Sequence, residues 1–76
     1  MLILYTKNNC QYCGKVKEAF LASSVVYEER NIENQDHLDE ARAKGAMTMP
    51  FLVDTTANVT IRESDEIINY GCECAF

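Results

Sequence analysis

The sequence predicts a small α/β domain in which helices cover a four-stranded mixed sheet. Apolar segments of strand length alternate with segments whose apolar residues recur at helical spacing, in the order β-α-β-α-β-β-α. A helix-length crossover separates the first two strands, which should therefore be parallel with a right-handed connection. A short polar segment joins the last two strands, which should be antiparallel. A chain of 76 residues is long enough for one such domain.

The first half of the chain supplies two strands and a helix. Residues 2–5 form an apolar run typical of a short buried strand. Residues 11–22 follow as a helix with one apolar face. The valine pair that starts at Val25 should begin the second strand, which should run to Asn31 or Ile32.

The middle of the chain predicts a second helix and a hairpin. Asn34 can cap this helix, and Gly45 can end it. Residues 51–53 and 59–61 are two short apolar segments on either side of a polar turn, which is the pattern of a β-hairpin.

The last helix should begin after the hairpin. Ser64 is a favourable capping residue, and Asp65 and Glu66 stand where the helix dipole favours negative charge. Gly71 should end this helix and leave residues 71–76 as a short tail that contains two cysteines.

Two thiols stand between the first strand and the first helix. At a helix N-terminus the unpaired N–H groups and the dipole favour a thiolate, and a cysteine three residues later can close a disulfide. Cys10 should lie at the exposed tip and Cys13 towards the core. A zinc site is the alternative, since Cys72 and Cys74 could complete four sulfur ligands. The strand–CxxC–helix context and the later Pro50 favour redox chemistry.

Composition excludes several classes of protein. A hydrophobic fraction of 47% with 25% charged residues is typical of a globular chain, and no apolar run has the length of a membrane span. The net charge of −5 argues against nucleic-acid binding. No secretory signal is visible, so we expect a cytoplasmic protein without a membrane partner. Residues 1–30 carry four basic and three acidic side chains, which makes the cysteine-bearing half relatively electropositive.

Three separated motifs together resemble a glutaredoxin over residues 2 to about 71. They are Lys7 ahead of the first cysteine with Tyr12 between the cysteines, Thr48-Met49-Pro50, and Ser64-Asp65-Glu66. The resemblance implies a thioredoxin-like fold with residues 1–76 as a single domain. It also implies a cis peptide bond at Pro50.

The sequence departs from the glutaredoxin pattern at two places. Gln11 stands where glutaredoxins usually have proline, and Arg62-Glu63 replace a common Gly-Gly pair. Glu63-Ser64 followed by Ile67 is instead similar to the N-terminal domain of a glutathione transferase. Both families bind the γ-glutamyl end of glutathione at this point.

The resemblance implies a glutathione-dependent thiol–disulfide oxidoreductase, an enzyme of electron transport and cell redox homeostasis. Glutathione would be its reducing cosubstrate, and disulfide-containing or glutathionylated proteins its partners. We expect a monomer with no metal. Cys10 would attack a disulfide and Cys13 would resolve the mixed disulfide. The residues implied to bind glutathione are Lys7, Tyr12, Thr48, Met49, Pro50, Ser64 and Asp65.

Two other functions remain open. One is a metal or iron–sulfur protein that uses Cys10 together with Cys13, Cys72, Cys74 or a glutathione thiol. The other is a redoxin that a reductase protein reduces in place of glutathione. The pair Cys72 and Cys74 has no counterpart in the family pattern, and His37 is expected to be a surface histidine.

Overall fold

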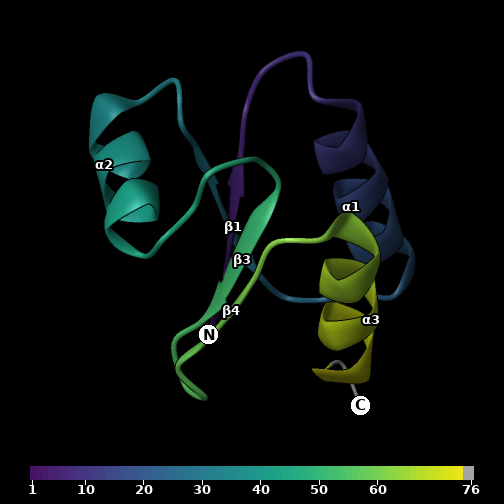
Figure 1. Ribbon diagram of the computed structural model, residues 1–76. Coiled ribbons are helices and arrows are strands. Elements are labelled where there is room, and N and C mark those ends of the chain that lie inside the picture. The colour runs from purple at the N-terminus through teal and green to yellow at the C-terminus, as the bar shows by residue number, and fades with distance from the viewer. Residues whose placement is uncertain (75–76) are drawn as a thin grey trace.

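The computed structural model describes residues 1–74 and contains the predicted order of elements (Figure 1). Four strands form one sheet in the order β2-β1-β3-β4, with β1 and β2 parallel and the other neighbours antiparallel. This arrangement confirms the thioredoxin-like α/β fold. The elements are β1 (Leu2–Thr6), α1 (Gln11–Ala22), β2 (Glu28–Asn31), α2 (Gln35–Ala43), β3 (Phe51–Asp54), β4 (Val59–Ile61) and α3 (Ser64–Cys74).

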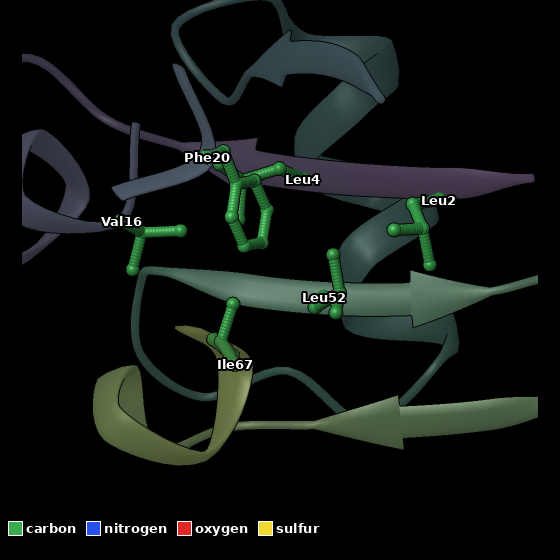
Figure 2. Packing of buried hydrophobic residues seen from close by; sticks show 6 residues of the cluster. All are labelled: Leu2, Leu4, Val16, Phe20, Leu52 and Ile67. Atoms are coloured by element: carbon green, nitrogen blue, oxygen red, sulfur yellow. The ribbon is translucent and has the colours of Figure 1, made fainter. Parts of the chain in front are cut away.

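Helices cover both faces of the sheet, with α1 and α3 side by side on one face and α2 on the other (Figure 1). Successive side chains of β1 point to opposite faces, so Leu4 packs with α1 and α3 while Tyr5 packs on the α2 side. Figure 2 shows the cluster on the α1 and α3 side, in which Phe20 and Ile67 pack with Leu52 of β3. Burial on both faces explains why β1 is apolar from Leu2 to Tyr5.

The second strand begins later than expected, at Glu28. Val25 is not in this strand because it completes the end of α1: its N–H bonds the Phe20 carbonyl at 2.9 Å, and the Ser24 N–H bonds the Leu21 carbonyl at 3.2 Å. These two bonds, with Ser24 at φ 56°, form a Schellman motif. The expected start at Val25 is therefore wrong, and Val26 is 89% exposed.

The last helix also differs from expectation at both ends. It begins with Ser64, and the Glu63 carbonyl accepts a hydrogen bond from the Ile67 N–H at 2.9 Å, so Glu63 and not Ser64 flanks the helix. It continues through Gly71 to Cys74, so Gly71 does not end it and residues 71–74 are not a tail. The glycine has a packing role instead, since a Cβ there would lie 2.4 Å from the Phe20 ring. Residues 75–76 lie outside the described residues. No helix within residues 1–74 is long and apolar enough to cross a membrane.

Asp54 accepts hydrogen bonds from separate segments at the end of the molecule that lies far from the cysteines. The Tyr70 hydroxyl donates to its carboxylate at 2.6 Å, and the N–H groups of Thr56 and Ala57 donate at 3.0 and 3.3 Å. The Met1 ammonium lies 3.9 Å away. These donors, with Tyr70 first, lower the pKa of Asp54 despite the opposing effect of burial.

Asp54→Asn should therefore destabilise the protein at neutral pH and much less in acid. The folded carboxyl has a pKa below its ordinary value of 3.8, so its stabilisation is complete above that value. The stabilisation is lost as the pH falls through the lower, folded value. Urea unfolding of both proteins at pH 7 and near pH 3 measures this. A difference in unfolding free energy that stays constant between the two pH values would contradict the role assigned to Asp54.

Candidate active site

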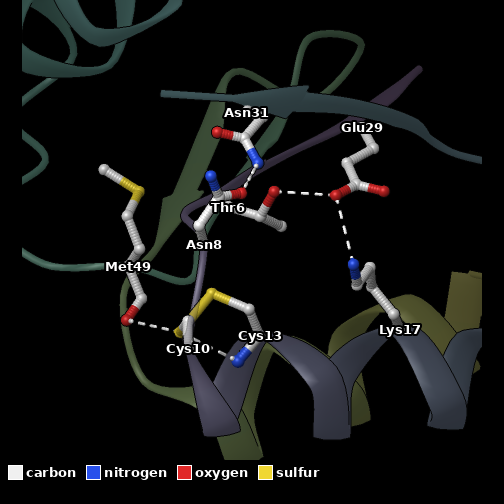
Figure 3. The surroundings of a disulfide bond; sticks show 8 residues. All are labelled: Thr6, Asn8, Cys10, Cys13, Lys17, Glu29, Asn31 and Met49. Atoms are coloured by element: carbon white, nitrogen blue, oxygen red, sulfur yellow. Dashed lines mark hydrogen bonds and ion pairs between the residues drawn. A yellow bond between two sulfur atoms is a disulfide. The ribbon is translucent and has the colours of Figure 1, made fainter. Parts of the chain in front are cut away.

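The predicted cysteines form a disulfide at the start of α1, directly beyond the end of β1 (Figure 3). Their Cα atoms are 5.2 Å apart. Cys10 is the N-cap of α1, and its Sγ accepts the Cys13 N–H at 3.2 Å. Cys13 is only 2% exposed whereas Cys10 is half-buried, which confirms the expected difference between the two thiols. A free Cys10 thiolate would keep this N–H and the helix dipole as stabilising partners.

Met49 faces the disulfide from the other side of the site (Figure 3). The Met49–Pro50 peptide bond is cis, as the family resemblance implied. The Met49 carbonyl oxygen lies 3.9 Å from the Cys10 Sγ, so the segment before β3 lies directly beside the reactive sulfur.

A groove of about 570 Å³ adjoins this segment. It brings together side chains from the loop before α1, from α1 itself, from the loop before β3 and from the start of α3. All seven residues implied to bind glutathione line it: Lys7, Tyr12, Thr48, Met49, Pro50, Ser64 and Asp65. The lining also contains Arg62 and Glu63, which the binding set predicted from the sequence omits.

A smaller hollow of about 160 Å³ continues the groove towards α2. It shares Lys7, Thr48 and Met49 with the groove and adds Arg42 from the last turn of α2. Sequence reasoning missed Arg42. The helix dipole favours a basic residue in the final turn of a helix whether or not a ligand binds there. The sequence pattern therefore did not indicate that Arg42 lines a cavity.

On the other side of Thr48, the groove meets a second hollow of about 580 Å³. The two cavities share Thr48, Arg62 and Glu63, and the second adds Glu66 of α3. Within residues 1–74, Lys7, Arg42 and Arg62 form no ion pair with a side chain of the protein. One end of the groove thus has a cation, Arg62, without an ion-pair partner among the described residues. Two more, Lys7 and Arg42, lie where the groove meets α2.

A polar network lies behind Cys13 (Figure 3). The buried Thr6 hydroxyl donates to the Glu29 carboxylate at 2.8 Å, and Lys17 of α1 pairs with the same oxygen at 3.3 Å. The Asn31 side-chain Nδ2 donates to the Asn8 side-chain Oδ1 at 3.0 Å. These contacts fix α1 and the loop of the first cysteine against β2, and they explain why this edge strand is charged.

Of the two further cysteines, Cys72 does not complete a metal site with the disulfide pair, and the side chain of Cys74 lies outside the described residues. The Cys72 thiol lies 3.3 Å from the Ser23 hydroxyl, at the C-terminal end of α1, whereas Cys10 stands at its N-terminal end. A helix of 12 residues separates these ends by about 18 Å. Among the described side chains, no group of three or more possible metal ligands occurs. His37 is half-buried and its Nδ1 lies 3.0 Å from the Asn31 carbonyl.

Solved structures similar to this chain share its fold. A mutant of the thioredoxin-like protein BC3987 superposes with a TM-score of 0.80 at 18% identity, covering 93% of this chain and 97% of that one. The unmutated BC3987 superposes with a TM-score of 0.76 at 19% identity, covering 92% of this chain and 97% of that one. The glutaredoxin-like NrdH-redoxin from Escherichia coli superposes with a TM-score of 0.74 at 21% identity, covering 90% of this chain and 91% of that one.

Sequence comparison identifies the family. No curated protein sequence matches the chain. The family model described as the glutathione S-transferase N-terminal domain matches residues 4–75, nearly the whole chain. This agrees with the similarity of Glu63-Ser64 and Ile67 to that domain. The chain carries a CxxC disulfide on a thioredoxin-like fold, and it belongs to the glutathione S-transferase N-terminal domain family.

Proposed function

We propose that the protein is a glutathione-dependent thiol–disulfide oxidoreductase that reduces protein disulfides and mixed disulfides with glutathione. The observation that carries this proposal is the groove beside the disulfide, which gathers all seven side chains implied to bind glutathione. Its wall meets the reactive sulfur through the Met49 carbonyl, 3.9 Å from the Cys10 Sγ.

The charges of the groove suit the three ionic groups of glutathione. The tripeptide carries an α-carboxylate and an α-ammonium at its γ-glutamyl end and a second carboxylate on its glycine. Asp65 can pair with the ammonium, and the first N–H groups of α3 beside Ser64 can bind the α-carboxylate. Lys7 and Arg42 can bind the glycyl carboxylate at the α2 end. The central thiol then lies beside Met49 and faces Cys10.

The reaction would proceed by two exchanges. The Cys10 thiolate attacks the glutathione sulfur of a mixed disulfide, which forms a Cys10–glutathione disulfide and releases the partner's thiolate to be protonated. A second glutathione thiolate then attacks the bound glutathione sulfur, which yields glutathione disulfide and restores the Cys10 thiolate. When the substrate is a protein disulfide, the Cys10 thiolate first attacks one of its sulfurs, which forms a Cys10–partner mixed disulfide and frees the partner's other sulfur as a thiolate. The Cys13 thiolate then attacks the Cys10 sulfur, which forms the observed Cys10–Cys13 disulfide and releases the partner as a dithiol. Two glutathione molecules then reduce that disulfide.

Turnover of a glutathionylated small thiol, with free glutathione as the only reductant, tests this function. We expect a rate well above the uncatalysed exchange, with glutathione disulfide as product. A protein that stays at the background rate, although its Cys10–Cys13 disulfide is fully reduced at the start, would contradict the proposal.

A second candidate is a redoxin that a reductase protein reduces. It is favoured by the similarity to NrdH-redoxin, which is described as a glutaredoxin-like protein with a thioredoxin-like activity profile. Reduction of the Cys10–Cys13 disulfide by NADPH and a thioredoxin reductase, but not by glutathione, would support this candidate over the first.

A further inference from the structure

Arg62 stands where the groove meets its larger neighbouring cavity. It lies between the end of β4 at Ile61 and the start of α3 at Ser64, so both elements fix its backbone. Its side chain lines both cavities. It also stands where glutaredoxins commonly have glycine.

The guanidinium has no ion-pair partner within the described part of the chain, although acidic residues surround it. Glu63 lines both cavities, Asp65 lines the groove and Glu66 lines its neighbour, yet none of them pairs with Arg62. An arginine that does not pair with its acidic neighbours leaves its donors available to a ligand. Its planar set of N–H groups matches a carboxylate in bidentate geometry.

The charge of the groove requires such a cation if the ligand is anionic. The lining contains two acidic residues, Glu63 and Asp65, and two basic ones, Lys7 and Arg62. Without Arg62 this end would present the carboxylates of Glu63 and Asp65 and no cation, so only the N–H groups at the start of α3 would attract a ligand carboxylate there. Lys7 cannot replace Arg62, because it also lines the hollow towards α2 and so lies at the other end of the groove.

We propose that Arg62 binds the α-carboxylate of the γ-glutamyl residue and so selects ligands that carry an anionic group at this end. The inference rests on the proposed function and adds a specificity-determining residue to it. Asp65 would bind the neighbouring ammonium. Arg62 and Asp65 would then each bind one of the two charged groups of the γ-glutamyl residue. Glu63 would then disfavour ligands with a further acidic group beside them.

Three S-methylated tripeptides separate these contacts, because none of them can exchange thiols with the protein. The first is S-methylglutathione. The second has a glutaryl group in place of γ-glutamate and lacks only the ammonium. The third has a 4-aminobutyryl group and lacks only the α-carboxylate. Calorimetry on the disulfide form of the full chain would measure each affinity for the wild type and for Arg62→Gln, Asp65→Asn and Arg42→Gln.

Arg62→Gln should weaken the first two ligands about tenfold and leave the third within about twofold, because only the third lacks the carboxylate. Asp65→Asn should weaken only the two ligands that carry an ammonium. Arg42→Gln is the matched control at the other end, and it should weaken all three alike because each keeps its glycyl carboxylate. An equal loss on all three ligands in Arg62→Gln, or no loss, would overturn the role of Arg62 alone. Absence of S-methylglutathione binding to the wild type would overturn this role and the proposed function together.

Discussion

Cys10→Ser should reduce the turnover of a glutathionylated small thiol by at least about 100-fold, because a serine hydroxyl is a far weaker nucleophile than a thiolate. Cys13→Ser should retain much of the activity in the same assay. Cys10 alone can form the mixed disulfide with glutathione, and a second glutathione can resolve it. With a protein disulfide as substrate, Cys13→Ser should instead accumulate a mixed disulfide between Cys10 and the partner.

The matched control is Cys72→Ser. This thiol is half-buried beside Ser23 at the far end of α1, so its removal should leave turnover unchanged. Mass spectrometry of the trapped intermediate identifies the cysteine that carries glutathione. Wild-type turnover in Cys10→Ser, or glutathione attached to Cys13 in preference to Cys10, would contradict the assignment of the nucleophile.

Gly71→Ala should destabilise the fold by about 1–3 kcal/mol, the usual range for adding a group to a filled core. The added Cβ would lie 2.4 Å from the Phe20 ring. That ring is fully buried between α1, α3 and β3, so it has little room to move (Figure 2). A loss of this size is a large share of the stability of a small domain. Thermal and urea unfolding, monitored by circular dichroism, would measure it.

Gly14→Ala is the matched control for that substitution. Gly14 is also helical, but a Cβ there would meet no atom within 4 Å. The same replacement should therefore stabilise α1 by about 0.5–1 kcal/mol through helix propensity. If both substitutions changed the unfolding free energy by the same amount, the close approach of Phe20 would not be the reason for glycine at position 71.

The sheet and its helices could be predicted because local patterns and packing agree along most of the chain. β1 is an apolar run since both of its faces are covered, and the Asn34 cap and Gly45 mark the ends of α2 where the structure has them. The cysteine pair and the residues around Pro50 and Ser64 were found through short motifs. Those motifs lie far apart in the sequence, and only the fold brings them to one groove.

The errors arose where tertiary contacts override a local pattern. Val25 has strand propensity, yet its N–H completes the Schellman motif of α1 and the strand begins later. Glycine is typical of a helix end, but at position 71 the structure needs its small size. The Phe20 ring, from 51 positions earlier in the chain, packs where a Cβ would lie. Arg62 could not be recognised as a groove residue, nor Arg42 as lining the adjoining hollow, because their sequence neighbours do not show which cavity they line.

Titration of the ¹⁵N-labelled disulfide form with S-methylglutathione tests the central claim most directly, since it reports binding separately from turnover. We expect amide shifts confined to the groove, with the largest at Lys7, Met49 and Ser64 and none near Asp54 at the opposite end. Shifts that are absent at those three positions, or that spread evenly over the molecule at millimolar ligand, would leave the thioredoxin-like fold intact and remove glutathione from the mechanism.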